Sequence, residues 1–154
     1  METFKQIIEL LDTHHISYEH LKHDFVHRSE EAAQVRRSSF EEAAKALVCQ
    51  ADGQIIMAVV PGPVKMSYNI LKKEIGAKKM CLASPEEVLS ATGLTIGSVP
   101  PFGIFWNIPM YVEKSLLAQE YMVFSAGSHY DSIRLKVEDY LKVVPAKVLE
   151  FRKE

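Results

Sequence analysis

The pair Asp52-Gly53, set between two apolar runs, constrains the fold of this chain more than any other feature. Residues 47–60 read "LVCQADGQIIMAVV". An Asp-Gly pair favours the two-residue turn that joins antiparallel strands, because both turn positions need a positive φ. The second run is apolar at consecutive positions, which indicates burial of both faces. The sequence therefore predicts a β-hairpin whose second strand, Ile55 to Val60, is buried in a sheet.

Helices are predicted from apolar spacing and capping residues. Apolar side chains recur at helical spacing over residues 3–12. A capping box with a first-turn proline at residues 84–87 predicts a helix that stops at Gly93. Another helix is expected to close at Gly76 and to lead into a short strand.

A second capping box, formed by Ser39 and Glu42, predicts one more helix in "FEEAAKAL". We expect this helix to begin at about Phe40 and to carry Lys45 late in its length.

Strands are expected in "ISYEHLKH", at Met110–Glu113 and Met122–Ser125, and in "SIRLK", which passes into a helix. Strands and helices mix without a regular βαβ repeat, which favours an α+β fold. With 154 residues and 47% hydrophobic content, the chain is predicted to form a single domain over residues 1–154, built on a mixed, strongly curved sheet flanked by helices.

Composition narrows the class of protein. The formal charge is −2 with both signs mixed along the chain, so any contact with nucleic acid must come from a local patch. Cys49 and Cys81 stand in apolar surroundings and are predicted to be buried free thiols in a reducing compartment. No segment approaches about 18 uninterrupted apolar residues, and the N-terminus lacks signal-peptide character, so a cytoplasmic protein with no membrane partner is expected.

Lys45 is the only charged residue in "AAKALVC". Its compact ammonium could hold a phosphate or an ester carbonyl as a point charge. The alternative is a solvated lysine on a helix surface.

The loop "GSVPPFG" is unusually rigid for a simple turn. Gly97 lets the backbone approach a ligand, and Pro101 fixes the chain, so the N–H groups of Ser98 and Val99 could point into a pocket as an oxyanion hole. The alternative is a purely structural Pro-Pro turn.

The segment "FSAGSHYDSIRL" presents Ser128 and His129 in a turn between two strands, where binding residues often gather. Adjacency alone does not make them a catalytic pair, and a turn histidine can simply be a surface residue.

Two further groupings carry less specific signals. The histidines and aspartate of "HLKHDFVH" have no recognisable zinc-ligand spacing, so no metal site is expected. A group of basic residues could contact phosphates, or it could simply form the solvent-exposed face of a helix. The members of the two groups are His20, His23, Asp24 and His27, and Arg36, Arg37, Lys72, Lys73, Lys78 and Lys79.

Taken together, "SFEEAAKALV", "VVPGPVKM", "SPEEVLSATGLTIGSVPPFG" and "FSAGSHYDSIRLKVEDYL" resemble, in order and spacing, the YbaK-type family of aminoacyl-tRNA deacylases. These are freestanding relatives of the editing domain inserted in some prolyl-tRNA synthetases. The resemblance covers about residues 18–143 and implies a barrel-like sheet. It implies that Lys45 is the central functional residue and that the Gly97–Pro101 loop cradles the aminoacyl ester. It also implies that the turn Ala126–His129 belongs to the site. The implied substrate contacts are Ser98, Val99, Pro101, Phe102, Gly127 and Ser128, with Lys45, Gly97 and His129 in catalytic roles.

The implied reaction is hydrolysis of the ester between a wrongly attached amino acid and the 3′ end of tRNA, without cofactor or metal. The substrate's own ribose hydroxyl would assist. Alanine or cysteine on proline tRNA is the commonest task of the family, and a synthetase is a possible further partner. Two alternatives stay open, a non-catalytic tRNA- or synthetase-binding module of the same fold and a metal-dependent hydrolase that uses the histidine cluster.

Overall fold

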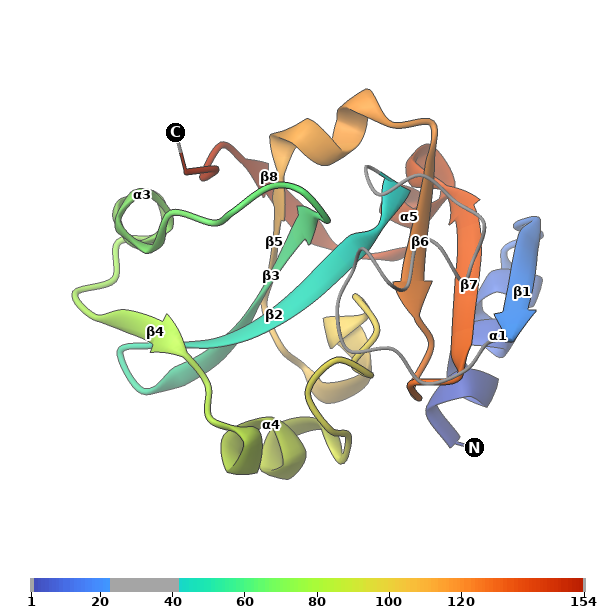
Figure 1. Ribbon diagram of the computed structural model, residues 1–154, viewed down its shortest axis with the longest axis horizontal. Helices are drawn as coiled ribbons and strands as arrows, with labels where there is room; N and C mark the ends of the chain where they lie inside the picture. The colour runs from blue at the N-terminus through green and yellow to red at the C-terminus, as the bar shows by residue number, and fades with distance from the viewer. Residues whose placement is uncertain (1, 23–41, 154) are drawn as a thin grey trace.

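The computed structural model describes residues 2–22 and 42–153 of the chain (Figure 1). Its elements, in order, are α1 (Glu2–Thr13), β1 (Tyr18–Lys22), β2 (Ala44–Ala51), β3 (Gln54–Pro61), α3 (Tyr68–Ile75), β4 (Met80–Leu82), α4 (Pro85–Thr92), the 3₁₀ helix η2 (Gly103–Trp106), β5 (Met110–Glu113), the 3₁₀ helix η3 (Lys114–Ala118), β6 (Tyr121–Ser125), β7 (Asp131–Lys136), α5 (Val137–Val143) and β8 (Ala146–Leu149).

The strands form two sheets. One has the order β1-β7-β6 and the other β4-β2-β3-β5-β8, in which β3, β5 and β8 run parallel and the remaining pairs are antiparallel. A parallel bridge between Ala43 and Val123 joins β6 to the chain just before β2. The predicted α+β class and mixed strand directions are confirmed. The sheets do not close into one barrel, so the strongly curved, barrel-like shape stays a prediction.

The hairpin forms where the sequence places it. Asp52 and Gly53 have φ values of 52° and 82°, and β3 is buried from Ile56 to Pro61. The Asp52 carboxylate accepts the backbone N–H groups of Lys78 and Lys79 at 2.8–3.1 Å. The turn is thereby tied to the segment that leads into β4.

The helix predicted to begin at about Phe40 is wrong over its described part. Residues 44–51 form β2, which pairs with β3 on one side and β4 on the other, and Lys45 lies opposite Val60. Ser39 and Phe40 lie outside the described residues. Helix propensity and capping are local preferences of a few kcal/mol at most, and two neighbouring strands outweigh them here.

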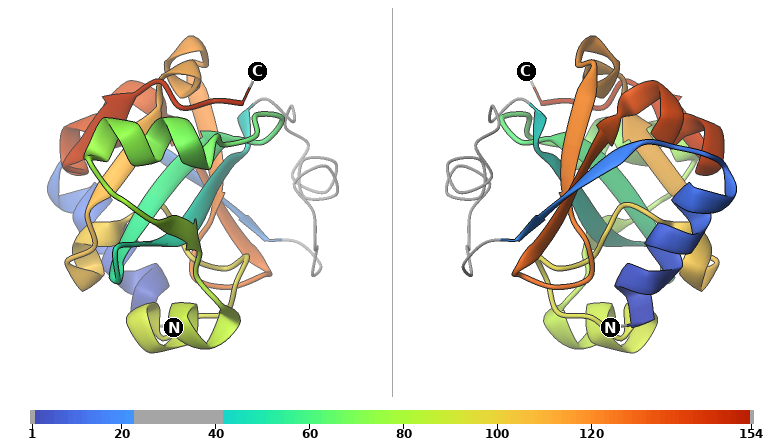
Figure 2. Two further views of the ribbon diagram at one scale, coloured as in Figure 1. Left: turned by 90° about the vertical axis from the view of Figure 1, so that its left-hand side faces the viewer. Right: turned by 90° about the vertical axis from the view of Figure 1, so that its right-hand side faces the viewer.

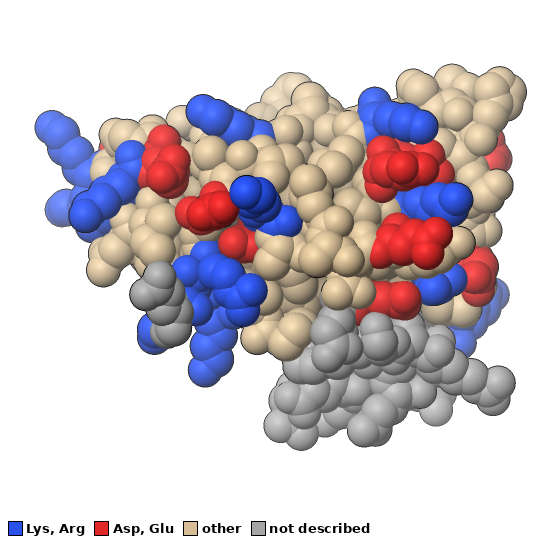
Figure 3. All heavy atoms as spheres, turned by 90° about the horizontal axis from the view of Figure 1, so that it is seen from above, with Lys and Arg blue, Asp and Glu red and all other residues tan. Residues whose placement is uncertain are grey.

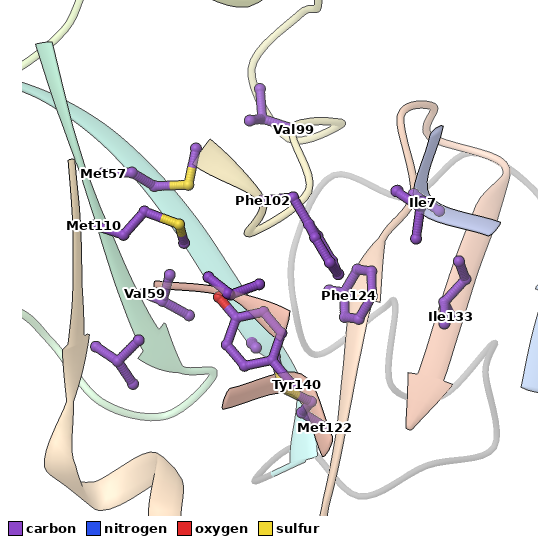
Figure 4. Packing of buried hydrophobic residues seen from close by; sticks show 14 of the residues in the cluster. Ile7, Met57, Val59, Val99, Phe102, Met110, Met122, Phe124, Ile133 and Tyr140 are labelled. Carbon is purple, nitrogen blue, oxygen red and sulfur yellow. The ribbon is translucent and has the colours of Figure 1, made fainter. Parts of the chain in front are cut away.

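Two clusters of buried side chains pack on opposite faces of β2 and β3. Phe102 lies in the first cluster, with its ring 5.3 Å from Phe124 and 5.6 Å from Tyr140 (Figure 4). Each such fully buried side chain contributes roughly 1.5–3 kcal/mol through burial. The loop that precedes Phe102 is therefore anchored in the core at one end.

Other predictions have mixed outcomes. The predicted caps of α3 and α4 are present, with Gly76 and Gly93 in the left-handed region. Both cysteines are free, but only Cys49 is buried, because Cys81 lies on the edge strand β4 and is exposed. No helix in the described part of the chain has the length and apolarity needed to cross a bilayer.

Candidate functional site

The Gly97 loop begins exposed and ends buried. Gly97 has φ +91°, a conformation that glycine adopts without strain. The Ser98 N–H donates to the Thr95 carbonyl at 3.1 Å, and the Ser98 hydroxyl donates to the same oxygen at 2.8 Å. The Ser98 N–H is therefore not the free donor that the sequence suggested. Within residues 2–22 and 42–153, the Gly97 and Val99 N–H groups have no hydrogen-bond acceptor.

The other end of the loop is fixed by the core. The Tyr140 hydroxyl donates to the Pro101 carbonyl at 2.6 Å, and burial raises the pKa of Tyr140 well above its usual value. Phe102 is fully buried. The free N–H groups thus project from a loop whose C-terminal end cannot shift without disturbing the packing.

The turn Ala126–His129 lies against this loop. Gly127 has φ +93°, and its N–H donates to the Ser98 carbonyl at 3.0 Å. A Cβ at this position would lie 3.1 Å from Cβ of Thr3 on α1. Both the backbone conformation and the close approach of α1 therefore favour glycine here.

His129 completes the contact between turn and loop. Its Nε2 lies 3.0 Å from Oγ1 of Thr95. A Cβ added to Gly97 would lie 3.0 Å from His129 Cε1. The structure thus brings together Gly97 and His129, which the sequence analysis selected separately.

The Ser128 hydroxyl is committed to the turn itself. It donates to the Asp131 carboxylate at 2.9 Å and accepts the N–H groups of Tyr130 and Asp131 at 3.1 Å each. The other Asp131 oxygen lies 2.7 Å from Nε2 of His20. Burial raises the pKa of Asp131, but hydrogen bonds from His20 and Ser128 lower it more, and the net shift is downward. Ser128 is therefore a turn-stabilising residue, and its predicted contact with substrate stays a prediction.

Only part of the histidine group in "HLKHDFVH", for which no metal site is expected, lies within the described residues. His20 pairs with Asp131 and packs on Phe4, with ring centroids 4.5 Å apart. His23, Asp24 and His27 lie outside the described residues, as do Arg36 and Arg37. The described ranges contain no group of three or more His, Cys, Asp or Glu side chains arranged to hold a metal ion.

Lys45 is half-buried on β2, and its environment is cationic. Partial burial lowers its pKa, and the nearby charge of Lys65 lowers it further. No ion pair between Lys45 and a carboxylate occurs among the residues that the structure describes. A half-buried ammonium whose pKa is lowered by a neighbouring cation, with no carboxylate partner among the described residues, favours the binding of an anion.

The bridge between the two sheets relates Lys45 to the turn. Because Ala43 and Val123 pair in parallel, the two segments leave the bridge in the same direction, one toward Lys45 and the other toward Ala126. At about 3.3 Å per residue, Lys45 lies about 7 Å and Ala126 about 10 Å along its strand from the bridge. By strand alternation, however, Lys45 shares the face of Leu47 and Cys49, which pack in or against the second cluster, whereas Val99 and Phe102 pack in the first. The Lys45 backbone therefore lies near the turn, whereas its side chain lies on the face of β2 away from Val99, with no hydrogen bond to the loop or the turn in the described structure.

Two grooves formed by described residues lie elsewhere. One runs between η3 and α5 beside Leu117 and Leu141, and the other lies between the hairpin and α4 beside Ile55 and Glu86. Neither is lined by a predicted site residue.

Sequence reasoning missed three residues of this region. Asp131 could have been found, because a serine with an aspartate three residues later is typical of a side-chain-capped turn. Thr95 and Lys65 carried no local signal, since only the tertiary fold brings them to His129 and Lys45.

Comparison with known proteins shows the class to which this chain belongs. Residues 23–143 match the family model described as the aminoacyl-tRNA editing domain. The chain belongs to this family, which confirms the resemblance drawn from the motifs.

Among curated relatives, the chain is similar to the multifunctional Ser/Thr-tRNA deacylase ProXp-y of Escherichia coli (strain K12), with 28% identity over 98% of this chain and 93% of that protein. It is 25% identical to the prolyl-tRNA editing protein ProX of Acetoanaerobium sticklandii, over 99% of this chain and 96% of that protein. The crystal structure of a candidate trans-editing enzyme for prolyl tRNA synthetase superposes with a TM-score of 0.84 at 23% identity, covering 100% of this chain and 99% of the other, which shows a shared fold.

Proposed function

We propose that this protein is a trans-editing hydrolase that removes a wrongly attached small amino acid from the 3′ end of tRNA. The observation that carries the proposal is the half-buried Lys45 ammonium, which lacks a described carboxylate partner and lies near a loop with free N–H groups. Family membership and the deacylase and editing names of the relatives support ester hydrolysis as the reaction.

Lys45 binds the phosphate of the terminal nucleotide in this proposal. A lysine ammonium can bind a phosphate or an ester carbonyl, and two features favour the phosphate. Lys45 shares its electrostatic environment with Lys65, which suits an anionic phosphodiester better than a neutral ester carbonyl. It also lies on the face of β2 away from Val99, so the ester carbonyl falls to the loop.

The Gly97 and Val99 N–H groups stabilise the developing oxyanion. Water adds to the carbonyl carbon, the bond to the ribose oxygen breaks, and that oxygen takes up the proton with assistance from the neighbouring ribose hydroxyl. One such donor is typically worth about 2.7–4 kcal/mol of transition-state stabilisation. An activated ester needs little more than this and correct positioning.

His129 orients the substrate or the attacking water beside Gly97. Its Nε2 is held by Thr95, so the ring is fixed in place. Ser128 is not the nucleophile in this scheme, because its hydroxyl already donates to Asp131.

A panel of mischarged tRNAs tests the proposal. It contains Ala- and Cys-tRNA(Pro), the substrates implied by the sequence resemblance, and Ser- and Thr-tRNA, which the name of one relative suggests. The proposal expects enzyme-dependent hydrolysis of at least one member and little hydrolysis of correctly charged Pro-tRNA(Pro). Because a pocket separates residues differing by one methylene by only about 1–3 kcal/mol, activity on more than one member is expected.

The alternative is a non-catalytic module of the same fold that binds tRNA or a synthetase. Binding of tRNA without hydrolysis of any panel member, under conditions where an active relative turns over, would favour this alternative.

A further inference from the structure

Three exposed cations are gathered by the pairing of two distant segments, and one of them, Lys65, lies close enough to Lys45 to lower the pKa of that lysine. Lys153 donates its N–H to the Lys65 carbonyl at 2.7 Å, and Ser67 donates its N–H to the Phe151 carbonyl at 2.7 Å. Between these bonds, Met66 and Arg152 form an antiparallel bridge. We call Lys65, Arg152 and Lys153 the C-terminal basic patch.

The backbone under this patch is rigid. Phe151 is fully buried and Met66 nearly so, both in the second hydrophobic cluster. Ser67 caps α3 by accepting the Ile70 N–H. The three basic side chains therefore extend into solvent from a fixed base.

The patch is not neutralised by the protein. No carboxylate pairs with its members within the described residues, and the neighbouring Glu150 pairs with Lys114 at 3.1 Å. Figure 3 shows several basic side chains on the left of the face, the side of α3 and the C-terminal segment in Figure 1, with some acidic ones between them; on the right the two kinds alternate. The charge of Lys65 reaches Lys45, so patch and candidate phosphate site form one positive region.

We propose that the C-terminal basic patch binds backbone phosphates of the tRNA acceptor strand upstream of the terminal nucleotide. The inference rests on the proposed function, because it places the strand by the contact of Lys45 with the terminal phosphate. Phosphate contacts position nucleic acid without reading its sequence, which suits a site whose specificity lies in the amino acid. The patch thus holds the strand so that its 3′ ester reaches the Gly97 loop.

The test compares two double variants that remove equal charge. Lys65→Ala/Lys153→Ala removes two patch cations, and Lys5→Ala/Lys142→Ala removes two exposed lysines from α1 and α5, on the other side of the molecule (Figure 1). Binding of uncharged tRNA is measured by fluorescence anisotropy from 50 to 200 mM salt. Single-turnover deacylation at increasing enzyme concentration gives the half-saturating concentration and the limiting rate.

Each lost phosphate contact with a single strand lowers the salt slope by about 0.7, so two lower it by about 1.4. Wild-type affinity should therefore fall roughly sevenfold more than that of the patch variant across this salt range. The patch variant should need a higher enzyme concentration for half-saturation and keep its limiting rate, and the control should match wild type in both.

Equal salt slopes and half-saturating concentrations for patch variant, control and wild type would overturn the proposal. A lower limiting rate with unchanged tRNA affinity would also overturn it, since the patch would then act on the chemical step. Because the anisotropy arm does not depend on catalysis, it distinguishes failure of this proposal from failure of the proposed hydrolase activity.

Discussion

Replacement of Gly97 by alanine separates two constraints that the structure places on one residue. A Cβ at this position would lie 3.0 Å from His129 Cε1, so the imidazole must give by a few tenths of an ångström, which strains its hydrogen bond to Thr95. The φ of +91° is also unfavourable for any residue with a Cβ. Backbone strain of this kind costs about 1–2 kcal/mol, and the lost hydrogen bond costs about 0.5–1.5 kcal/mol.

Gly93 offers a matched control. It has φ +76° at the end of α4, and a Cβ there would have no atom within 4 Å. Gly93→Ala should therefore show the strain without the collision. With roughly 2–4 °C of melting temperature per kcal/mol for a domain of this size, strain alone should lower the melting temperature of either variant by about 2–8 °C.

Activity should distinguish the two variants. Gly97→Ala displaces the loop N–H groups or His129, and loss of one oxyanion donor would slow single-turnover hydrolysis on the order of a hundredfold or more. Gly93→Ala should hydrolyse at close to the wild-type rate. His129→Ala combined with Gly97→Ala should restore the hydrogen-bond geometry of the loop in part, so the double variant should be less impaired than the sum of the single losses. Equal rates for Gly97→Ala and Gly93→Ala would refute the reasoning and make the loop a scaffold.

Three further predictions concern charge and metal. Lys45→Met should abolish most deacylation yet leave thermal stability unchanged or raised, because the lowered pKa of Lys45 means that the fold disfavours its charge. Lys45→Arg should not fully restore the rate, since a planar guanidinium replaces a compact ammonium. Wild-type turnover in Lys45→Met would show that Lys45 is not part of the site. Activity should survive exhaustive chelation with EDTA, and loss of activity that zinc restores would support the histidine-cluster hydrolase instead. The pKa of Asp131 is lowered in the folded protein, so its charge stabilises the fold above the usual aspartate pKa of about 3.9, and this contribution is lost as the pH falls through the lower folded value. Asp131→Asn should therefore have a lower melting temperature than wild type at pH 7 and the same melting temperature in acid. A difference in melting temperature that does not depend on pH would contradict this account.

Turns and helix caps were predictable from the sequence because they depend on residues close together in the chain. The Asp52-Gly53 turn and the caps at Ser84 and Gly76 depend on residues within one turn of each other, and each is present. The assignment of Lys45 to a helix failed for the opposite reason. "AAKAL" has good helix propensity, and only its pairing with β3, together with the bridge from Ala43 to Val123, makes it a strand.

The candidate site was predictable as a set of residues but not as an arrangement. Gly97 and His129 carried signals of their own, glycine for its backbone freedom and histidine for its place in a turn. Their contact depends on the Thr95 hydroxyl and on the bond from Gly127 to Ser98, which no sequence spacing encodes. The use of the Ser98 N–H inside its own turn was equally invisible, because it depends on the φ and ψ angles that the loop adopts.

Core packing between the two sheets bears on the candidate site. Among the described residues the sheets are joined by one bridge, between Ala43 and Val123 (Figure 2). Apolar side chains such as Phe102, Phe124 and Tyr140 therefore supply much of the cohesion there (Figure 4). The C-terminal end of the Gly97 loop is anchored to the same aromatic residues, through the hydrogen bond from the Tyr140 hydroxyl to the Pro101 carbonyl and the packing of Phe102 on Tyr140. A mutation that opens a cavity there should weaken substrate binding before it unfolds the protein. Because the hydrophobic contribution weakens on cooling, the candidate site should also lose its alignment at low temperature. Under the proposed function, selection on these buried rings acts through the accuracy of editing as well as through stability.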